Sequence, residues 1–189
     1  MLTMEAIQTD RLTIRPFTMD DLEEIHRILD VDLKWDNLDL EQREGWLRWA
    51  VSNEYQLGRL YQPPYGDRAV TLTETHILIG SVGLVPAFGP FDQLRYFKER
   101  PKAHAKNHPE VGLFWAIDPA YQGQGYATEA AQALIEYAFG ELNLKQIVAT
   151  TEYSNERSQA VMDRLGMAIE KNPFPDPPWF QVVGILENV

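Results

Sequence analysis

The sequence predicts a mixed α/β fold, in which helices cover both faces of one sheet. Residues 11–15 alternate polar with apolar side chains, as half-buried strands do. A second strand is read at residues 147–152, where Ile147, Ala149 and Thr151 alternate with Val148, Thr150 and Glu152. Between these segments, the apolar positions of residues 127–138 recur at i, i+3, i+4 and i+7, the spacing of a helix with one buried face. Strand-like and helix-like segments follow one another along the chain, which is typical of a mixed α/β sheet.

The N-terminal half contains three predicted strands and two predicted helices. Pro16 ends the strand at residues 11–15, because proline cannot donate a ladder hydrogen bond. Thr18 is a suitable N-cap for a helix over about residues 19–30. The elements expected after it are a helix from about Leu40 to Asn53, a chain break at Pro63-Pro64-Tyr-Gly66, and paired strands at 69–74 and 76–85 around Glu74-Thr75.

The C-terminal half holds the remaining predicted elements. Asp118-Pro119 turns the chain after a strand, and Asn143 suits the left-handed stop of a helix. The elements expected there are a strand at Val111–Ile117, a helix opened by Tyr121–Thr128, a strand at 147–152, a helix from Ser154-Asn155 to Leu165-Gly166, and a strand near Phe180–Leu186.

Composition limits the class of protein. The chain has 189 residues, which suits one domain over residues 1–189, and 44% of them are hydrophobic. It contains no cysteine, so disulfides, a thiolate nucleophile and cysteine-based zinc sites are excluded. No apolar run approaches a membrane span and no secretory signal is recognisable, so we expect a cytoplasmic protein without a membrane partner. A net charge of −11 argues against nucleic acid as a partner.

The glycine-bearing turn in residues 121–128 predicts a phosphate site. It lies between a predicted strand and a helix N-terminus, where free N–H groups and the positive end of the helix dipole favour phosphate oxygens. A P-loop needs Gly-Lys-Ser/Thr, and the turn has no lysine. The dinucleotide fingerprint needs Gly or Ala where this chain has Thr128. A plain helix-start turn is the alternative.

The pattern that does fit is Gln122-x-x-Gly125-x-Ala127. It resembles the acetyl-CoA pyrophosphate loop of the GNAT superfamily of N-acetyltransferases, and more narrowly the chain is similar to the RimJ/RimL branch, which acetylates ribosomal-protein N-termini. The supporting segments occur in the family's order: Thr9-Asp-Arg-Leu-Thr-Ile-Arg-Pro16, Ile79-Gly-Ser-Val-Gly-Leu84, Gly125-Tyr-Ala-Thr-Glu-Ala130, Asn155-Glu-Arg-Ser158 and Leu165-Gly-Met167. The resemblance implies the GNAT fold, with a central, mostly antiparallel sheet.

The resemblance also implies where the cosubstrate acetyl-CoA binds. Backbone N–H groups would hold the pyrophosphate along Gln122, Gly123, Gln124, Gly125, Tyr126 and Ala127. The backbone of Ala116, Ile117 and Asp118 would pair with the pantetheine arm like an added strand. Asn155 and Ser158 would face the pantetheine and the thioester. Asn155 also suits helix N-capping, and both roles can coexist.

By the same resemblance, the reaction is direct transfer of acetyl to a primary amine, either a protein N-terminus or a small molecule. Glu110 is the candidate base, although it precedes Pro119 by nine residues where the family usually has seven. A solvated edge carboxylate is the alternative. Many GNAT enzymes protonate the leaving thiolate with a tyrosine, but Met162 occupies that position and can donate nothing. Ser158 is the candidate substitute, and a first-turn helix residue is the alternative.

The stretch 86–110 differs from its surroundings and is expected to be a long acceptor-side loop. It is rich in proline and basic residues, with a short helix plausible around Phe91–Glu99. We predict that it selects an acceptor with an acidic part. Contact with the 3′-phosphate of CoA, or with the protein's own acidic surface, is the competing account. His104 and His108 have metal-ligand spacing on a helix, but the flanking prolines argue against that helix, so no metal is expected.

Two questions stay open at this level. A non-catalytic acyl-CoA-binding module is the rival function, because the usual tyrosine is absent and the glutamate is displaced. The oligomeric state, monomer or homodimer, does not follow from the sequence.

Overall fold

A computed structural model of the chain describes residues 4–62 and 65–189, so Pro63 and Pro64, predicted to break the chain, lie outside the described residues. The chain folds into two compact units. Unit 1 comprises Met1–Val85 and Phe114–Glu136, and unit 2 comprises Pro86–Leu113 and Tyr137–Val189. The expectation of one domain over residues 1–189 stays a prediction.

Unit 1 is built on antiparallel strands in the order β1-β2-β3-β4. These are β1 (Ile7–Gln8), β2 (Leu12–Arg15), β3 (Gly66–Leu72) and β4 (Leu78–Gly89). The hairpin of β3 and β4 confirms the strand pair predicted around Glu74-Thr75. The last residues of β5 (His108–Ile117) lie next to β4 in the sheet. Directly after β5, Asp118 N–H donates to Ile79 O on β4 at 2.9 Å.

Two helical segments precede β3 in the chain. The predicted helix at 19–30 is confirmed as a continuous helical run, made of a 3-10 turn at Met19–Asp21, α1 (Leu22–His26) and a π-helical stretch at Arg27–Asp32. The second helix, α2 (Leu40–Arg59), ends beyond the predicted Asn53. Tertiary contacts support the extra turns, since Glu54 on α2 accepts from the buried Arg68 guanidinium at 2.9 Å.

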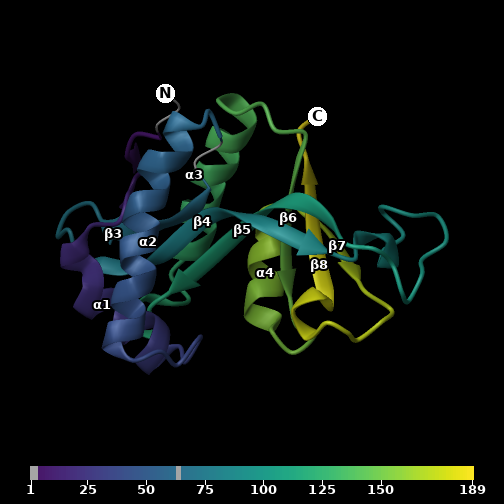
Figure 1. Ribbon diagram of the computed structural model, residues 1–189, viewed down its shortest axis with the longest axis horizontal. Helices are drawn as coiled ribbons and strands as arrows, with labels where there is room; N and C mark the ends of the chain where they lie inside the picture. Colours follow the sequence, from purple (N-terminus) through teal and green to yellow (C-terminus); the bar gives the residue numbers. More distant parts are fainter. Residues whose placement is uncertain (1–3, 63–64) are drawn as a thin grey trace. The chain divides into compact units, whose positions relative to one another are not determined.

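The core of unit 1 lies between these helices and the strands. Ile25, Ile28 and Leu47 have no exposed surface, and they pack in one cluster with Ala69 of β3 and Leu78 of β4. Figure 1 shows α1 and α2 in front of the unit 1 strands, with α3 (Tyr126–Gly140) behind them. Helices therefore flank this part of the sheet on both faces, as predicted.

Unit 2 carries a second run of strands in the order β5-β6-β8-β7. Here β5 pairs in parallel with β6 (Gln146–Thr151), β8 (Val182–Glu187) is antiparallel to β6, and β7 (Ala168–Lys171) is antiparallel to β8. Helix α4 (Glu156–Arg164) packs on this run, with Met162 close to Gly184 of β8. The sequence analysis missed β7 and β1, because both are short and mostly exposed and depend on pairing with a neighbour.

The stretch 86–110 is less of a loop than expected. Its first residues continue β4 to Gly89 and its last begin β5 at His108. The helix expected around Phe91–Glu99 is a single 3-10 turn at Phe91–Gln93. The side chains of Phe91 and Leu94 are buried in a cluster with Phe180. This packing fixes the backbone after one turn, so the helix does not continue. No helix within residues 4–62 and 65–189 has the length and apolar character needed to cross a bilayer.

Candidate functional site

The end of β5 is held by Asp118. Its Oδ1 accepts from Ala120 N–H at 2.8 Å and caps the turn at Pro119–Tyr121, while its Oδ2 pairs with the Arg27 guanidinium at 2.7 Å. The hydrogen bond that Arg27 donates to Asp118 raises the pKa of Arg27, so the guanidinium stays charged. The backbone N–H of Asp118 already bonds Ile79. The carbonyl of Ile117 in turn accepts from Gln122 Nε2 at 2.8 Å, so this side chain ties the glycine-bearing turn to the end of β5.

Residues 122–127, here called the glycine loop, join this turn to α3. Gly123 has φ +76° and Gly125 has φ +85°, a left-handed conformation that favours glycine. A side chain at Gly123 would meet nothing within 4 Å, so the backbone there is open. The first bond of the helix runs from Glu129 N–H to Gly125 O at 3.0 Å. The N–H groups of the preceding turn thus point out of the helix end.

Arg11 is a functional candidate that the sequence analysis missed. Its Nη1 donates to Gln124 O at 3.0 Å, and its guanidinium lies 4.4 Å from the centre of the Tyr126 ring. Its Nε donates to Glu129 Oε2 at 2.7 Å. The guanidinium places a positive charge beside the glycine loop of an acidic protein. The signal was present, since Arg11 lies in one of the family's segments and Glu129 in another.

Glu129 locks this arrangement. Its Oε1 accepts from Thr9 Oγ1 at 2.6 Å and from the Arg11 N–H at 3.0 Å. Burial opposes ionisation of Glu129, but the hydrogen bonds from Thr9 and Arg11 outweigh it and hold the pKa of that carboxyl below its usual value. The carboxylate therefore stays charged and fixes Arg11 against the first turn of α3.

Asn155 and Ser158 lie together in unit 2 at the start of α4. Asn155 is the N-cap, and its Oδ1 accepts from Ser158 N–H at 3.1 Å. The capping alternative is therefore confirmed for Asn155. The bond uses neither the Asn155 amide nitrogen nor the Ser158 hydroxyl, and Ser158 is half-buried.

Glu110 lies on β5 in unit 2, next to β6. Its Oε2 accepts from Gln146 Nε2 at 2.6 Å, and its Oε1 is 3.5 Å from His108 Nδ1. Its side chain is only 16% exposed. Glu110 is thus a positioned carboxylate, bonded to a neighbouring strand, and not a freely solvated edge residue.

Tyr96 and Met162 also lie in unit 2. Burial, followed by the hydrogen bond and charge of Glu187 and the charge of Glu110, raises the pKa of Tyr96 to about 12. Met162, at the position where many GNAT enzymes have a tyrosine, is fully buried against Gly184 and so serves packing. His104 lies in an exposed turn and His108 on β5, so they do not share a helix.

The structure thus gathers the predicted residues in two groups. Unit 1 holds the end of β5, the glycine loop and the start of α3, with Arg11 beside them. Unit 2 holds Glu110 with Gln146, and Asn155 with Ser158.

Comparison with known proteins gives the family. Residues 11–168 match the domain described as "Acetyltransferase (GNAT) domain". YnaD of Bacillus subtilis, named an uncharacterized N-acetyltransferase, is 49% identical over 61 residues, which are 32% of this chain and 35% of YnaD. The matched stretch therefore spans about a third of that relative's length.

Solved structures share the fold over nearly the whole chain. An acetyltransferase from Agrobacterium tumefaciens is 26% identical with a TM-score of 0.69, and the match covers 99% of this chain and 96% of that one. A ribosomal-protein-S5-alanine acetyltransferase from Vibrio fischeri has a TM-score of 0.67 at 18% identity, covering 97% and 96%. These neighbours confirm the expected fold.

Proposed function

Because this chain belongs to the GNAT acetyltransferase family, we propose that it transfers the acetyl group of acetyl-CoA directly to a primary amine, on a protein N-terminus or a small molecule. The observation that carries the proposal is the glycine loop. Two left-handed glycines open the backbone at the N-terminal end of α3, and the Arg11 guanidinium lies beside them. N–H groups, the helix dipole and a cation are what pyrophosphate oxygens require.

The acceptor has to lose a proton before it can attack. A lysine-like amine with pKa about 10.4 costs about 4–5 kcal/mol to neutralise at pH 7, whereas an α-amine costs about 1 kcal/mol. An N-terminal acceptor therefore needs little help from a base. We propose Glu110 for that help, directly or through water, since its carboxylate is oriented by Gln146.

The thiolate of CoA leaves as the new amide forms, and it needs a proton. We propose that Ser158 donates it, with its position set by the bond from its N–H to the Asn155 cap. The backbone of Ala116 and Ile117 is proposed to hold the pantetheine arm.

The proposal is tested by binding and turnover together. The wild-type protein is mixed with acetyl-CoA and a panel of N-terminal peptides and small amines, and release of free thiol is recorded. Calorimetry with Gly125→Glu should show acetyl-CoA binding lost, because a carboxylate would stand where the phosphates approach. Gly125→Ala shares the backbone strain of the left-handed position without the charge, and should weaken binding less.

Gly140→Glu is the matched control, since it makes the same change at the other end of α3, where a side chain meets nothing within 4 Å. Unchanged acetyl-CoA affinity in a folded Gly125→Glu protein would contradict the site. A non-catalytic acyl-CoA-binding module remains the second candidate, favoured by the buried Met162. It predicts acetyl-CoA binding without thiol release for any amine.

A further inference from the structure

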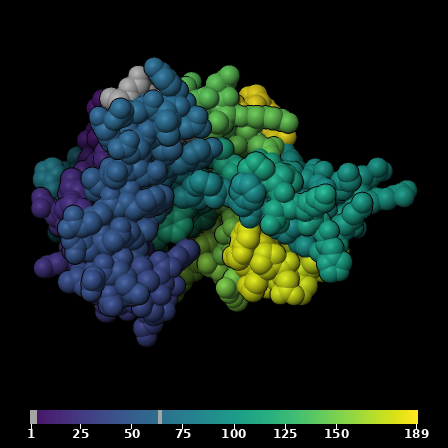
Figure 2. Space-filling view, viewed as in Figure 1, coloured from purple at the N-terminus to yellow at the C-terminus, as the bar shows by residue number. Residues whose placement is uncertain are grey.

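Unit 2 contains a cavity that the proposed reaction does not use. Its volume is about 590 Å³, within the usual range for ligand sites. All four residues of β7 line it, together with Arg95, Tyr96, Pro101, Pro173 and Ile185. Figure 2 shows the surface of the segment after β4 beside that of the C-terminal segment, which are the two parts of unit 2 that form this cavity.

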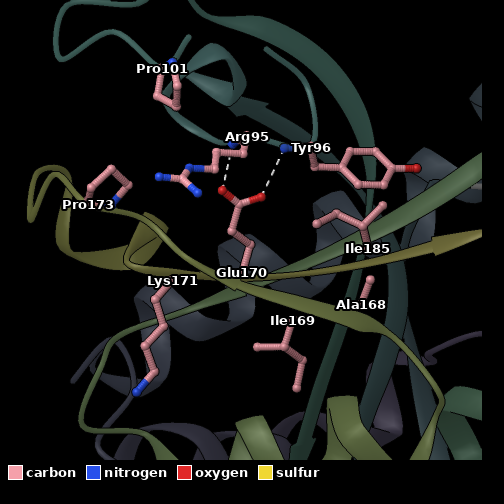
Figure 3. Close-up of a pocket in the computed structure, with 9 residues that line it drawn as sticks. All are labelled: Arg95, Tyr96, Pro101, Ala168, Ile169, Glu170, Lys171, Pro173 and Ile185. Carbon is pink, nitrogen blue, oxygen red and sulfur yellow. Dashed lines mark hydrogen bonds between the residues drawn. The ribbon is translucent and has the colours of Figure 1, made fainter. Parts of the chain in front are cut away.

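The cavity follows the free edge of β7. This strand is last in the order β5-β6-β8-β7 and pairs only with β8 among the described strands. Figure 3 shows Glu170 pointing toward the backbone of Arg95 and Tyr96, while Ile169 and Lys171 point the other way. An edge strand offers unpaired N–H and C=O groups at the spacing of an extended peptide.

The charges around this edge are unbalanced. The Glu170 carboxylate accepts from the backbone N–H groups of Arg95 at 2.6 Å and Tyr96 at 3.0 Å, so amide donors already satisfy it. Within the part of the chain that the structure describes, no ion pair involves the Arg95 guanidinium or the Lys171 ammonium. Two cations and one carboxylate therefore line the cavity, which gives it a net positive charge in a protein whose net charge is −11.

Apolar groups complete the lining. Ile169 is 38% exposed and lies with Pro101, Pro173 and Ile185 around the same space. Such a surface suits the backbone and methylene groups of a peptide, while Arg95 and Lys171 suit its carboxylates.

We propose that the β7 edge binds an extended peptide segment that carries carboxylate side chains. This assignment rests on the proposed function: the segment is the part of a protein acceptor that follows the acetylated residue. The peptide backbone lies along β7, and its carboxylates contact Arg95 and Lys171. The site thus selects acidic acceptor proteins, and it does so through residues that take no part in acetyl transfer.

Binding is tested without any need for turnover. The probe is a fluorescent peptide whose N-terminus is already acetylated and whose sequence carries several Asp and Glu, compared with a peptide in which these are Asn and Gln. Fluorescence anisotropy should show tighter binding of the acidic peptide, weakening as salt is raised. The double variant Arg95→Ser/Lys171→Ser should weaken its binding about two- to twentyfold, as expected for two exposed charge pairs.

The matched control is Lys145→Ser/Arg164→Ser, which removes one lysine and one arginine from exposed positions of unit 2 outside the cavity. Equal loss in both double variants would mean a general charge effect and would overturn the proposal. Equal binding of the neutral peptide would do the same. Light scattering supplies a further check, because a wild-type dimer that dissociates in the cavity variant would show that the edge pairs with a second copy instead.

The outcome is independent of the proposed function. If no amine is acetylated and the acidic peptide still binds at Arg95 and Lys171, the cavity assignment stands and the transferase proposal fails. If acetylation of an acidic peptide proceeds with the same KM in wild type and cavity variant, the cavity assignment fails and the transferase proposal stands.

Discussion

At the scale of single residues, the guanidinium of Arg11 links three parts of the glycine loop and its helix. It donates to Gln124 O, lies over Tyr126 and pairs with Glu129. It therefore both shapes the loop and places a charge where we propose that phosphates bind.

We expect Arg11→Ala to weaken acetyl-CoA binding about two- to tenfold, the range for one partly exposed charge contact, with the acceptor KM little changed. Isothermal calorimetry gives the affinity. Arg48→Ala is the control, since Arg48 is an exposed cation of unit 1 that pairs with Glu44 on α2. Equal affinity of the Arg11→Ala protein and wild type would remove Arg11 from the site.

Ser158 offers a second test at this scale. If its hydroxyl protonates the thiolate, Ser158→Ala should lower kcat about ten- to a thousandfold with a smaller change in KM, because the bond matters in the transition state. The Asn155 cap survives, since it uses the Ser158 backbone N–H. Ser154→Ala, one residue before that cap, is the control, and a wild-type kcat for Ser158→Ala would point to water as the donor.

At the scale of elements, β3 contains a carboxyl that destabilises the fold. Asp67 Oδ1 has no accessible surface and, among the described residues, no hydrogen-bond partner. The residue as a whole is half-buried, but the carboxyl atoms decide its ionisation. Burial raises the pKa of Asp67 to about 6, against the charge of Arg43 and with the help of Asp36.

The sign of the pH effect follows from this shift. The folded pKa of Asp67 lies above the unfolded value of about 3.9, so the native state binds more protons between these values. The stability contributed by protonated Asp67 is full below pH about 4 and is lost as pH rises through about 6. Asp67→Asn should therefore raise the free energy of unfolding by about 1–3 kcal/mol at pH 7 and change it little at pH 4.

Urea denaturation at a series of pH values measures this difference. Subtracting the free energy of unfolding of wild type from that of Asp67→Asn at each pH isolates the effect of Asp67. The contributions of Asp21, Asp30 and Glu129, whose lowered pKa values make stability fall at low pH, cancel in this difference. Asp10→Asn, at an exposed position, should leave the profile unchanged. Parallel profiles for wild type and Asp67→Asn would show that Asp67 is not desolvated.

At the scale of the whole molecule, the net charge of −11 opposes an anionic cosubstrate. Acetyl-CoA is a multiply charged anion, so long-range repulsion slows its approach until salt screens it. We expect the association rate, measured by stopped-flow fluorescence, to rise between about 20 and 200 mM salt. A falling rate would show that the local field of Arg11 outweighs the net charge.

Local pattern sufficed for most elements of the chain. The periodicity of residues 127–138 predicted α3, and Thr18, Asn143 and Gly166 stand at the helix ends where their chemistry suits them. The glycine loop was recognisable because a few consecutive residues determine both its left-handed backbone and the start of the helix that follows it. The family followed from that short motif and the order of its companions.

What only the tertiary structure decided involves partners distant in sequence. Strand β7 has little apolar periodicity and exists because β8 pairs with it. Arg11 meets Glu129 across more than a hundred residues, the carboxyl of Asp67 is buried beside α2, and Glu170 anchors the backbone of Arg95. A sequence specifies local backbone preference through each residue and its neighbours, whereas burial, ion pairing and strand edges depend on which segments the fold brings together.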